Sequence, residues 1–294
     1  MKILLINEST WRQHAKAHQE KVDHLTTEWR QYSASGKKHP TLDFLFSYYN
    51  LKINRLRLWS PGPDITLEGE HDGSLLFGHY SQSKKHCQLN PERYPKQRLK
   101  NFKWISQLLK QTSERIPVFN CYGVHEWSMI YKSDSKRHEQ LPLRVSTKTL
   151  DNFVESTPCQ CTHFDAYRFF TDDASPLIQH PLSRENQEEY EQSGCLHANM
   201  DLYKWAYKLY PFMTGDLLLR CFELAIQCRY LDMQASPYDM SEFKMEPIAV
   251  DTSQGREKYI SEQHRLKKIA DPIRTELANA YDNFIAICNK ESTI

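Results

Sequence analysis

Apolar residues recur at helical spacing over much of this chain, most regularly in its C-terminal part. The segments that keep this spacing longest are residues 196–210, 215–233 and 255–289. Three earlier segments show it less regularly, namely residues 8–31, 40–49 and 96–110. The pattern predicts a mainly α protein with a few short strands (α+β) and a helical C-terminal half.

Only short segments show strand-like patterns. Residues 65–67 and 74–77 flank Asp72-Gly73, a typical turn dipeptide, and predict a β-hairpin. Residues 162–170 alternate and predict a further strand, whereas residues 80–93 look irregular. We therefore expect a helical N-terminal lobe with a hairpin (1–115) and a His- and acid-rich, mainly helical lobe (116–294). No linker separates the two, so one single domain is the alternative.

Composition narrows the classes of function. The chain has 294 residues, of which 39% are hydrophobic and 26% charged, as is typical of a globular protein. Only 9 residues are Gly, which argues against a glycine-rich phosphate-binding loop, and a Gly-x-Ser-x-Gly elbow is also absent. The net charge of +1 provides no global attraction for nucleic acid, so any basic surface must be local.

The sequence also bears on location and thiol chemistry. No apolar stretch approaches the roughly 20 residues that span a bilayer, and no signal peptide is apparent, so we expect a cytoplasmic protein without membrane contact. The 8 cysteines are then expected to be reduced. Cys159 and Cys161 precede His163, but no second ligand pair follows at zinc-finger spacing. We therefore interpret these cysteines as structural.

Four short pairs of histidine and acid stand beside aromatic residues, and they are the main candidates for chemistry. The pairs are His39 and Asp43, His125 and Glu126, His163 and Asp165, and His197 and Asp201. Imidazole beside carboxylate is typical of general acid–base catalysis and of metal binding. The flanking aromatic rings favour a buried polar site with flat walls, which suits a nucleobase.

Each pair also has a structural interpretation. His197 and Asp201 lie one helical turn apart, which also suits a solvated polar face with local ion pairs. Asp43 falls in the first turn of a predicted helix, where an acid favours the helix dipole and caps the helix. His163 and Asp165 share one face of the predicted strand with Tyr167, and a buried structural pair is the alternative. The adjacent side chains of His125 and Glu126 diverge, so this pair is the weakest.

Two basic segments are candidates for nucleic-acid contact. Arg55 and Arg57 precede a Trp, and Lys100 and Lys103 alternate with aromatic residues. Basic side chains neutralise phosphates and aromatic rings stack on exposed bases. The alternative is an ordinary amphipathic helix with solvated lysines.

Several long segments resemble a known family of bacterial proteins. They are residues 43–49 (Asp-Phe-Leu-Phe-Ser-Tyr-Tyr), 124–127 (Val-His-Glu-Trp), 162–170, 194–205 and 231–239. In these segments the chain is similar to bacterial proteins of about this length that are labelled 3-methyladenine DNA glycosylase. The resemblance implies hydrolysis of the N-glycosidic bond of a modified base. The chain lacks the helix–hairpin–helix motif of better-understood enzymes with that label, so their catalytic residues have no counterparts here.

A glycosylase flips the modified base between aromatic walls and uses a carboxylate to stabilise positive charge on the sugar. Asp165 is the first candidate for this carboxylate and Asp201 the second. The other catalytic candidates are His163, His197, His125 and Glu126. The substrate-binding candidates are Tyr167, Trp127, Trp205, Tyr48, Asp43 and His39. Arg55, Arg57, Lys100 and Lys103 are the DNA-binding candidates.

This hypothesis requires no cofactor and no metal, and its partner is double-stranded DNA that contains a modified base. One alternative is a metal-dependent oxygenase of the non-haem iron type, in which the histidines and neighbouring acids are ligands. Another is a protein that binds modified DNA without cutting it. Protein partners cannot be deduced from the sequence.

Overall fold

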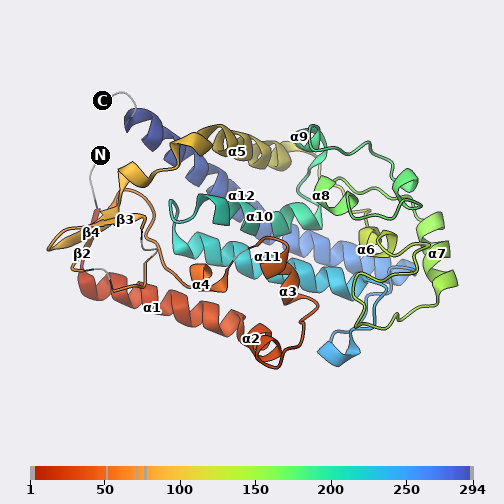
Figure 1. Ribbon diagram of the computed structural model, residues 1–294. Helices are drawn as coiled ribbons and strands as arrows, with labels where there is room; N and C mark the ends of the chain where they lie inside the picture. Colours follow the sequence, from red (N-terminus) through yellow and green to blue (C-terminus); the bar gives the residue numbers. More distant parts are fainter. Residues whose placement is uncertain (1–3, 51, 71, 76–77, 292–294) are drawn as a thin grey trace. The chain divides into compact units, whose positions relative to one another are not determined.

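The computed structural model describes residues 4–50, 52–70, 72–75 and 78–291. Its helices are α1 (Glu8–Leu25), α2 (Thr27–Ala34), α3 (Leu42–Ser47), α4 (Ile53–Leu56), α5 (Leu99–Glu114), α6 (Val124–Ser128), α7 (Thr147–Ser156), α8 (Phe164–Tyr167), α9 (Gln187–Tyr190), α10 (Leu196–Leu209), α11 (Gly215–Ala235) and α12 (Ser253–Glu291). Its strands are β1 (Leu4–Ile6), β2 (Ile65–Glu68), β3 (Tyr80–Gln82) and β4 (His86–Leu89). This composition confirms the predicted mainly α class with a few strands and a helical C-terminal half (Figure 1).

The chain forms two compact units, each made of separate stretches. Unit 1 comprises Met1–Leu109, Leu202–Glu223 and Ile273–Ile294, and unit 2 comprises Lys110–Asp201 and Leu224–Pro272. Both units are therefore discontinuous in sequence, and α10, α11 and α12 contribute residues to each of them. The division of the chain into lobes at residues 115 and 116 stays a prediction.

Unit 1 contains a four-stranded sheet of order β1-β2-β4-β3. β2 pairs in parallel with β1, with Leu67 opposite Ile6, and antiparallel with β4, with Leu67 opposite Cys87. The predicted strand over residues 65–67 is confirmed, but its predicted hairpin partner over residues 74–77 is wrong. Leu75 makes only an isolated parallel bridge to Trp59, and residues 76–77 lie outside the described residues.

The segment predicted to be irregular, residues 80–93, contains β3 and β4, so that prediction is also wrong. In β4, Cys87 and Leu89 are buried whereas His86 and Gln88 are exposed, which is the period of two of a half-buried strand. The strand was missed because His86 and Gln88 are polar and the alternation lasts only four residues. Such short runs carry little periodic signal.

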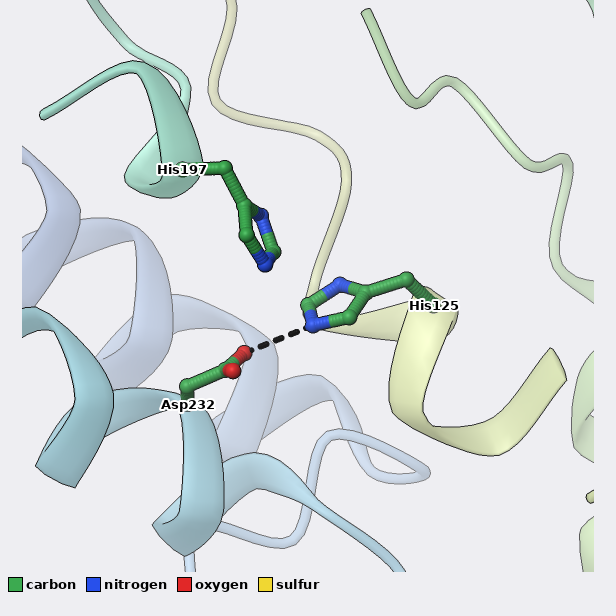
Figure 2. A group of neighbouring side chains, drawn as sticks. All are labelled: His125, His197 and Asp232. Atoms are coloured by element: carbon green, nitrogen blue, oxygen red, sulfur yellow. Dashed lines mark ion pairs between the residues drawn. The ribbon is translucent and has the colours of Figure 1, made fainter. Parts of the chain in front are cut away.

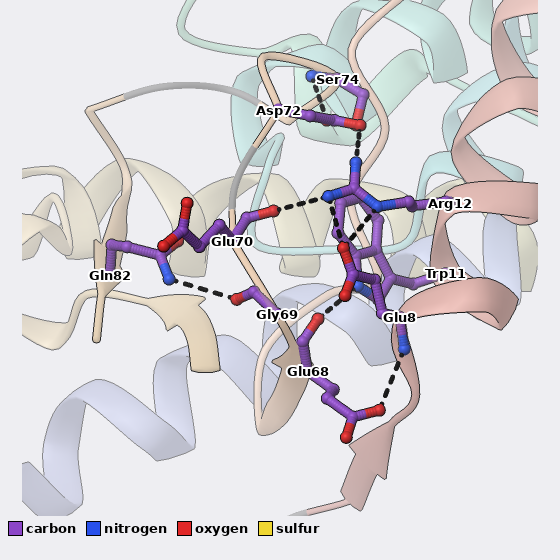
Figure 3. A network of polar contacts seen from close by, with 9 residues as sticks. All are labelled: Glu8, Trp11, Arg12, Glu68, Gly69, Glu70, Asp72, Ser74 and Gln82. Atoms are coloured by element: carbon purple, nitrogen blue, oxygen red, sulfur yellow. Dashed lines mark hydrogen bonds and ion pairs between the residues drawn. The ribbon is translucent and has the colours of Figure 1, made fainter. Parts of the chain in front are cut away.

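The start of α1 is fixed to β2 and its following turn by a polar network in unit 1 (Figure 3). The indole Nε1 of Trp11 donates to the carbonyl of Glu68 at 2.8 Å, and the ring lies in a core with Leu67 and Cys87. Arg12 bridges Glu8 of its own helix and Asp72. At Gly69 the backbone has φ +86°, and an added Cβ would lie 2.6 Å from the Glu8 carboxylate. The Glu8 carboxylate ends a flexible side chain and can move, so it is the positive φ that favours glycine at that position.

The longest helix, α12, begins with a hydroxyl cap and continues through a proline. Thr252 accepts a hydrogen bond from the backbone amide of Gly255 at 3.1 Å. Gly255 lies so close to the preceding loop that an added Cβ would be 2.0 Å from the carbonyl oxygen of Ala249. Pro272 lies inside the helix and marks the end of unit 2. None of the helices in the described part of the chain is long and apolar enough to cross a membrane.

All eight cysteines are free thiols, and all except Cys121 are buried. Burial raises the pKa of the thiols of Cys87 and Cys159 to about 11. A thiol with so high a pKa is almost entirely protonated at neutral pH and therefore unreactive. The cysteines behave as small apolar residues of the core.

Candidate functional site

Three side chains of unit 2 converge from three different helices. His125 lies on α6, His197 in the first turn of α10, and Asp232 near the end of α11 (Figure 2). One ligand atom of each side chain lies within 4.8 Å of the other two, and all three side chains are buried. This group, the His125–His197–Asp232 cluster, is a candidate metal site.

The closest contact in the cluster joins His125 to Asp232. Nε2 of His125 lies 2.8 Å from Oδ1 of Asp232, and the ring of His197 stands edge-on to that of His125 with centroids 4.3 Å apart. Both contacting atoms are buried, so an imidazole nitrogen and a carboxylate oxygen face each other away from water.

The protonation states of His197 and Asp232 suit metal binding. Burial holds the pKa of His197 well below its ordinary value, and His125 and His163 lower it further, so the ring is neutral. Burial by itself raises the pKa of Asp232, but His125 and Arg229 outweigh it and hold that pKa below its ordinary value. A neutral imidazole and an ionised carboxylate are the forms that bind metal ions.

A metal ion in the cluster would have to separate His125 from Asp232. Two atoms that a tetrahedral ion holds at about 2.1 Å lie about 3.4 Å apart. The direct contact between His125 and Asp232 is shorter than this. Metal binding would therefore replace that contact and move the two side chains apart by several tenths of an ångström.

A buried arginine fixes the second oxygen of Asp232. Nη1 of Arg229, one turn earlier on α11, contacts Oδ2 of Asp232 and donates to Oε1 of Glu126 at 2.6 Å. Arg229 is only 2% exposed, so both ion pairs are shielded from water. This arrangement leaves Oδ1 of Asp232 for His125. Glu126 is therefore linked to Asp232 through Arg229.

His163 forms a second group of charged side chains in unit 2. Its Nδ1 accepts from the backbone amide of Ala166 at 3.3 Å, so His163 is the N-cap of α8. Its Nε2 lies 3.3 Å from Asp201 and 3.8 Å from Glu191. The rings of His163 and His197 are nearly parallel with centroids 5.3 Å apart, so the two groups adjoin.

The strand predicted over residues 162–170 is wrong, because residues 164–167 form the short helix α8. The helix separates His163, at its N-cap, from Asp165, in its first turn. Asp165 accepts from Arg184 at 2.7 Å and lies 3.8 Å from Arg168. The first candidate for the catalytic carboxylate is thus paired with two arginines, whereas Asp201 contacts an imidazole.

His197 and Asp201 do lie one turn apart on a helix, as their spacing predicted, but the alternative of a solvated polar face is wrong. Asp201 is 1% exposed and His197 is 9% exposed. In this unit the two side chains have different partners, since Asp201 contacts His163 and His197 contacts His125. Three of the four predicted histidines therefore belong to one buried site.

The fourth histidine lies in unit 1, where it caps a helix. Nδ1 of His39 accepts from the backbone amide of Leu42 at 3.1 Å, and the carboxylate of Asp43 accepts from the amide of His39 at 3.0 Å. Trp29 donates its indole N–H to the same carboxylate at 2.7 Å. These contacts agree with the structural interpretation of this pair, in which its side chains cap the start of a helix.

The four stacking candidates differ in exposure. Trp127 is fully buried in unit 2, where its Nε1 donates to the carbonyl of Ala235 at 2.9 Å, and Trp205 is 2% exposed in unit 1. Tyr167 is half-buried, and half-buried Tyr48 stacks on Phe44 with centroids 4.7 Å apart. Only Tyr167 and Tyr48 therefore present ring surface to a ligand without a rearrangement.

The DNA-binding candidates all lie in unit 1. Lys100 and Lys103 are exposed on α5. Arg57 forms an ion pair with Asp23 at 2.9 Å, and the Arg55 guanidinium lies over the ring of Tyr207 at 5.1 Å. Arg55 also lines a cavity of unit 1 together with Tyr94 and Arg98.

Asp232, Arg229 and Glu191 contact the site but were not predicted from the sequence. A signal for the first two existed, because Arg229 and Asp232 stand one turn apart in a helix that is otherwise mostly apolar. Charged residues are rarely fully buried unless they are paired. Glu191 follows a short polar helix and carried no such signal.

Comparisons of the chain with protein-family models, with curated proteins and with solved structures found no match. The site geometry is therefore the basis for assigning a function.

Proposed function

We propose that this protein is a metal-dependent enzyme in which His125, His197 and Asp232 hold one divalent transition-metal ion. The observation that carries the proposal is the convergence of three buried ligand atoms, one each from His125, His197 and Asp232, within 4.8 Å of one another. An ion between them would be held by two imidazoles and one carboxylate.

The donor set narrows the choice of ion. Two imidazoles and one carboxylate suit zinc in hydrolytic enzymes and iron(II) in non-haem oxygenases, and both kinds of site keep positions open for substrate. The ion would supply a Lewis acid for hydrolysis or a binding position for oxygen. The protein supplies the rest: Arg229 orients Asp232, and His163 with Asp201 can hold or move a proton beside the ring of His197.

Metal analysis of the purified protein tests this proposal. We expect about one zinc or iron ion per chain, with Asp232→Asn reducing the content to background. The matched control is Asp216→Asn, which changes an exposed acid on the same helix and should retain the ion. Iron would favour the oxygenase and zinc a hydrolase. Wild-type protein that stays metal-free after incubation with iron(II) or zinc would overturn the proposal.

A second candidate function is the release of a modified base from DNA. It is favoured by Asp201, a buried carboxylate beside the imidazole of His163, which provides the acid–base pair that hydrolysis of an N-glycosidic bond needs. This candidate needs no metal.

Mass spectrometry of bases released from duplex DNA distinguishes the two candidates. The substrates should include alkylated, deaminated and hypermodified bases, each with and without a chelator. Base release that persists with chelator and is lost in Asp201→Asn would support the glycosylase. Asp165→Asn is the comparison variant. Because Asp165 is already paired with Arg184, its replacement should reduce base release less than the replacement of Asp201 does. Absence of release from every substrate would exclude this candidate for the bases tested.

A further inference from the structure

Unit 1 contains a cavity of about 660 Å³ that shares no residue with the His125–His197–Asp232 cluster. It is lined from α10 and the segment after it, from the segments around Asn50 and Arg55, and from the turn that contains η1 (Pro91–Arg93) and η2 (Lys96–Arg98). Its volume is typical of a site for a small molecule.

Aromatic residues form part of the lining of the cavity. Tyr49, Tyr94, Tyr210 and Phe212 line it and are buried, and Tyr207, which also lines it, is half-buried and therefore the most accessible of the five. The rings of Tyr94 and Phe212 pack edge-on with centroids 5.3 Å apart, which fixes their orientation. These rings give the cavity rigid aromatic lining.

The lining also contains a group of basic residues. Its five cationic residues are Arg55, Arg93, Arg98, Lys204 and Lys208, against the single acid Glu92. The whole chain has a net charge of only +1, so this concentration of positive charge is local. The positive charge also affects His79, which lines the cavity. Burial lowers the pKa of His79, and the nearby charges of Arg55 and Arg93 lower it further.

Aromatic rings beside clustered guanidinium groups recognise a flat ring that carries a phosphate. Arginine binds phosphate through two parallel hydrogen bonds, and aromatic side chains stack on bases of any sequence. We propose that this cavity binds a nucleotide, with its phosphate at Arg93 and Arg98 and its base against the aromatic residues of the lining. The single acid Glu92 provides an acceptor for a sugar hydroxyl.

The nucleotide could be free or the end of a DNA strand, and calorimetric titration separates these sources. The probes are a purine and a pyrimidine mononucleotide, the matching nucleosides, inorganic phosphate, and a short single strand with a 5′-phosphate. We expect a mononucleotide or the strand to bind more tightly than either the nucleoside or phosphate alone. The tighter of the two identifies the source.

Variants show whether binding uses the cavity. Arg93 and Arg98 are exposed, so the double variant Arg93→Gln/Arg98→Gln should fold normally, and circular dichroism checks this. It should weaken nucleotide binding about tenfold or more. The matched control, Lys84→Gln/Lys85→Gln, removes the same charge from an exposed turn of unit 1 outside the cavity lining and should leave nucleotide affinity unchanged. The proposal is overturned if no nucleotide or strand binds, if nucleosides bind equally well, or if both double variants weaken binding equally.

Discussion

Nε2 of His163 lies 3.3 Å from Oδ2 of Asp201, and each of these side chains is 1% exposed. The carboxylate therefore belongs with the capping histidine of α8, although it shares a helix with His197. This pairing separates the buried polar site into two parts that substitutions can test independently. One part is the cluster of His125, His197 and Asp232, and the other is His163 with its acids.

We expect Asp201→Asn to retain the metal ion at the wild-type level, because Asp201 is not among the three ligand residues. Asp232→Asn should lose it. Metal analysis of the two purified variants, prepared side by side, makes the comparison. Equal loss of metal in both would contradict the division of the site into two parts.

Replacing Arg229 should destabilise the protein strongly. Arg229 neutralises Glu126 and Asp232 in a buried setting, and removing one partner of a buried ion pair costs about 3–5 kcal/mol. We expect Arg229→Met to lower the free energy of unfolding by about this amount in urea denaturation. The control is Arg265→Met, because Arg265 also pairs with an acid three residues away, Glu262, but is 48% exposed. Its effect should stay below about 1 kcal/mol, and similar losses for both variants would argue against a buried network.

Gly255→Ala should destabilise unit 2, although alanine is the better helix former. Alanine at an ordinary helical position would stabilise by up to about 1 kcal/mol. Here its Cβ would lie 2.0 Å from the backbone oxygen of Ala249, and overpacking of this kind costs about 1–3 kcal/mol or more. Steric repulsion therefore outweighs propensity, and the melting temperature should fall. The exposed neighbour variant Gln254→Ala should melt like wild type, and a more stable Gly255→Ala would refute the close approach.

His18 should make stability fall as the pH is lowered. Burial lowers the pKa of His18 below its ordinary 6.5, and its Nε2 lies 2.8 Å from the carbonyl oxygen of Leu56. The unfolded chain then binds the proton more readily than the folded chain. The contribution of neutral His18 is complete above about pH 6.5 and is lost as the pH falls from there toward the folded pKa.

His18→Gln tests this, because its amide can donate to the same carbonyl but does not titrate. Melting temperatures measured between pH 8 and 5 should fall less steeply for the variant than for wild type. Parallel curves would show that His18 is not the titrating group.

The sequence predicted the long helices well and the short elements poorly. Residues 196–210 and 215–233 became α10 and α11 with ends that differ by at most two residues, because each carries several turns of apolar spacing. β3, β4 and α8 contain only three or four residues. A period cannot be distinguished over such a short run, so tertiary contacts decide the conformation.

The candidate site was predicted in part. The His–acid motifs predicted His125, His163 and His197 as site residues, and these three histidines do belong to one buried site in unit 2. Their partners were not predictable from local spacing, since Asp232 reaches His125 from a helix far along the chain. Such pairs depend on how helices pack, which a motif of five residues does not encode.

The buried cysteines provide a means to follow the opening of each unit. Cys87, Cys221 and Cys288 lie in unit 1, and Cys159, Cys161, Cys195 and Cys228 in unit 2, all free and buried. Alkylation requires an accessible thiolate, so a reagent can label these positions only when the surrounding structure opens. Peptide mapping of the labelled thiols over time would then give a separate opening rate for each unit from a single sample of the unmodified protein.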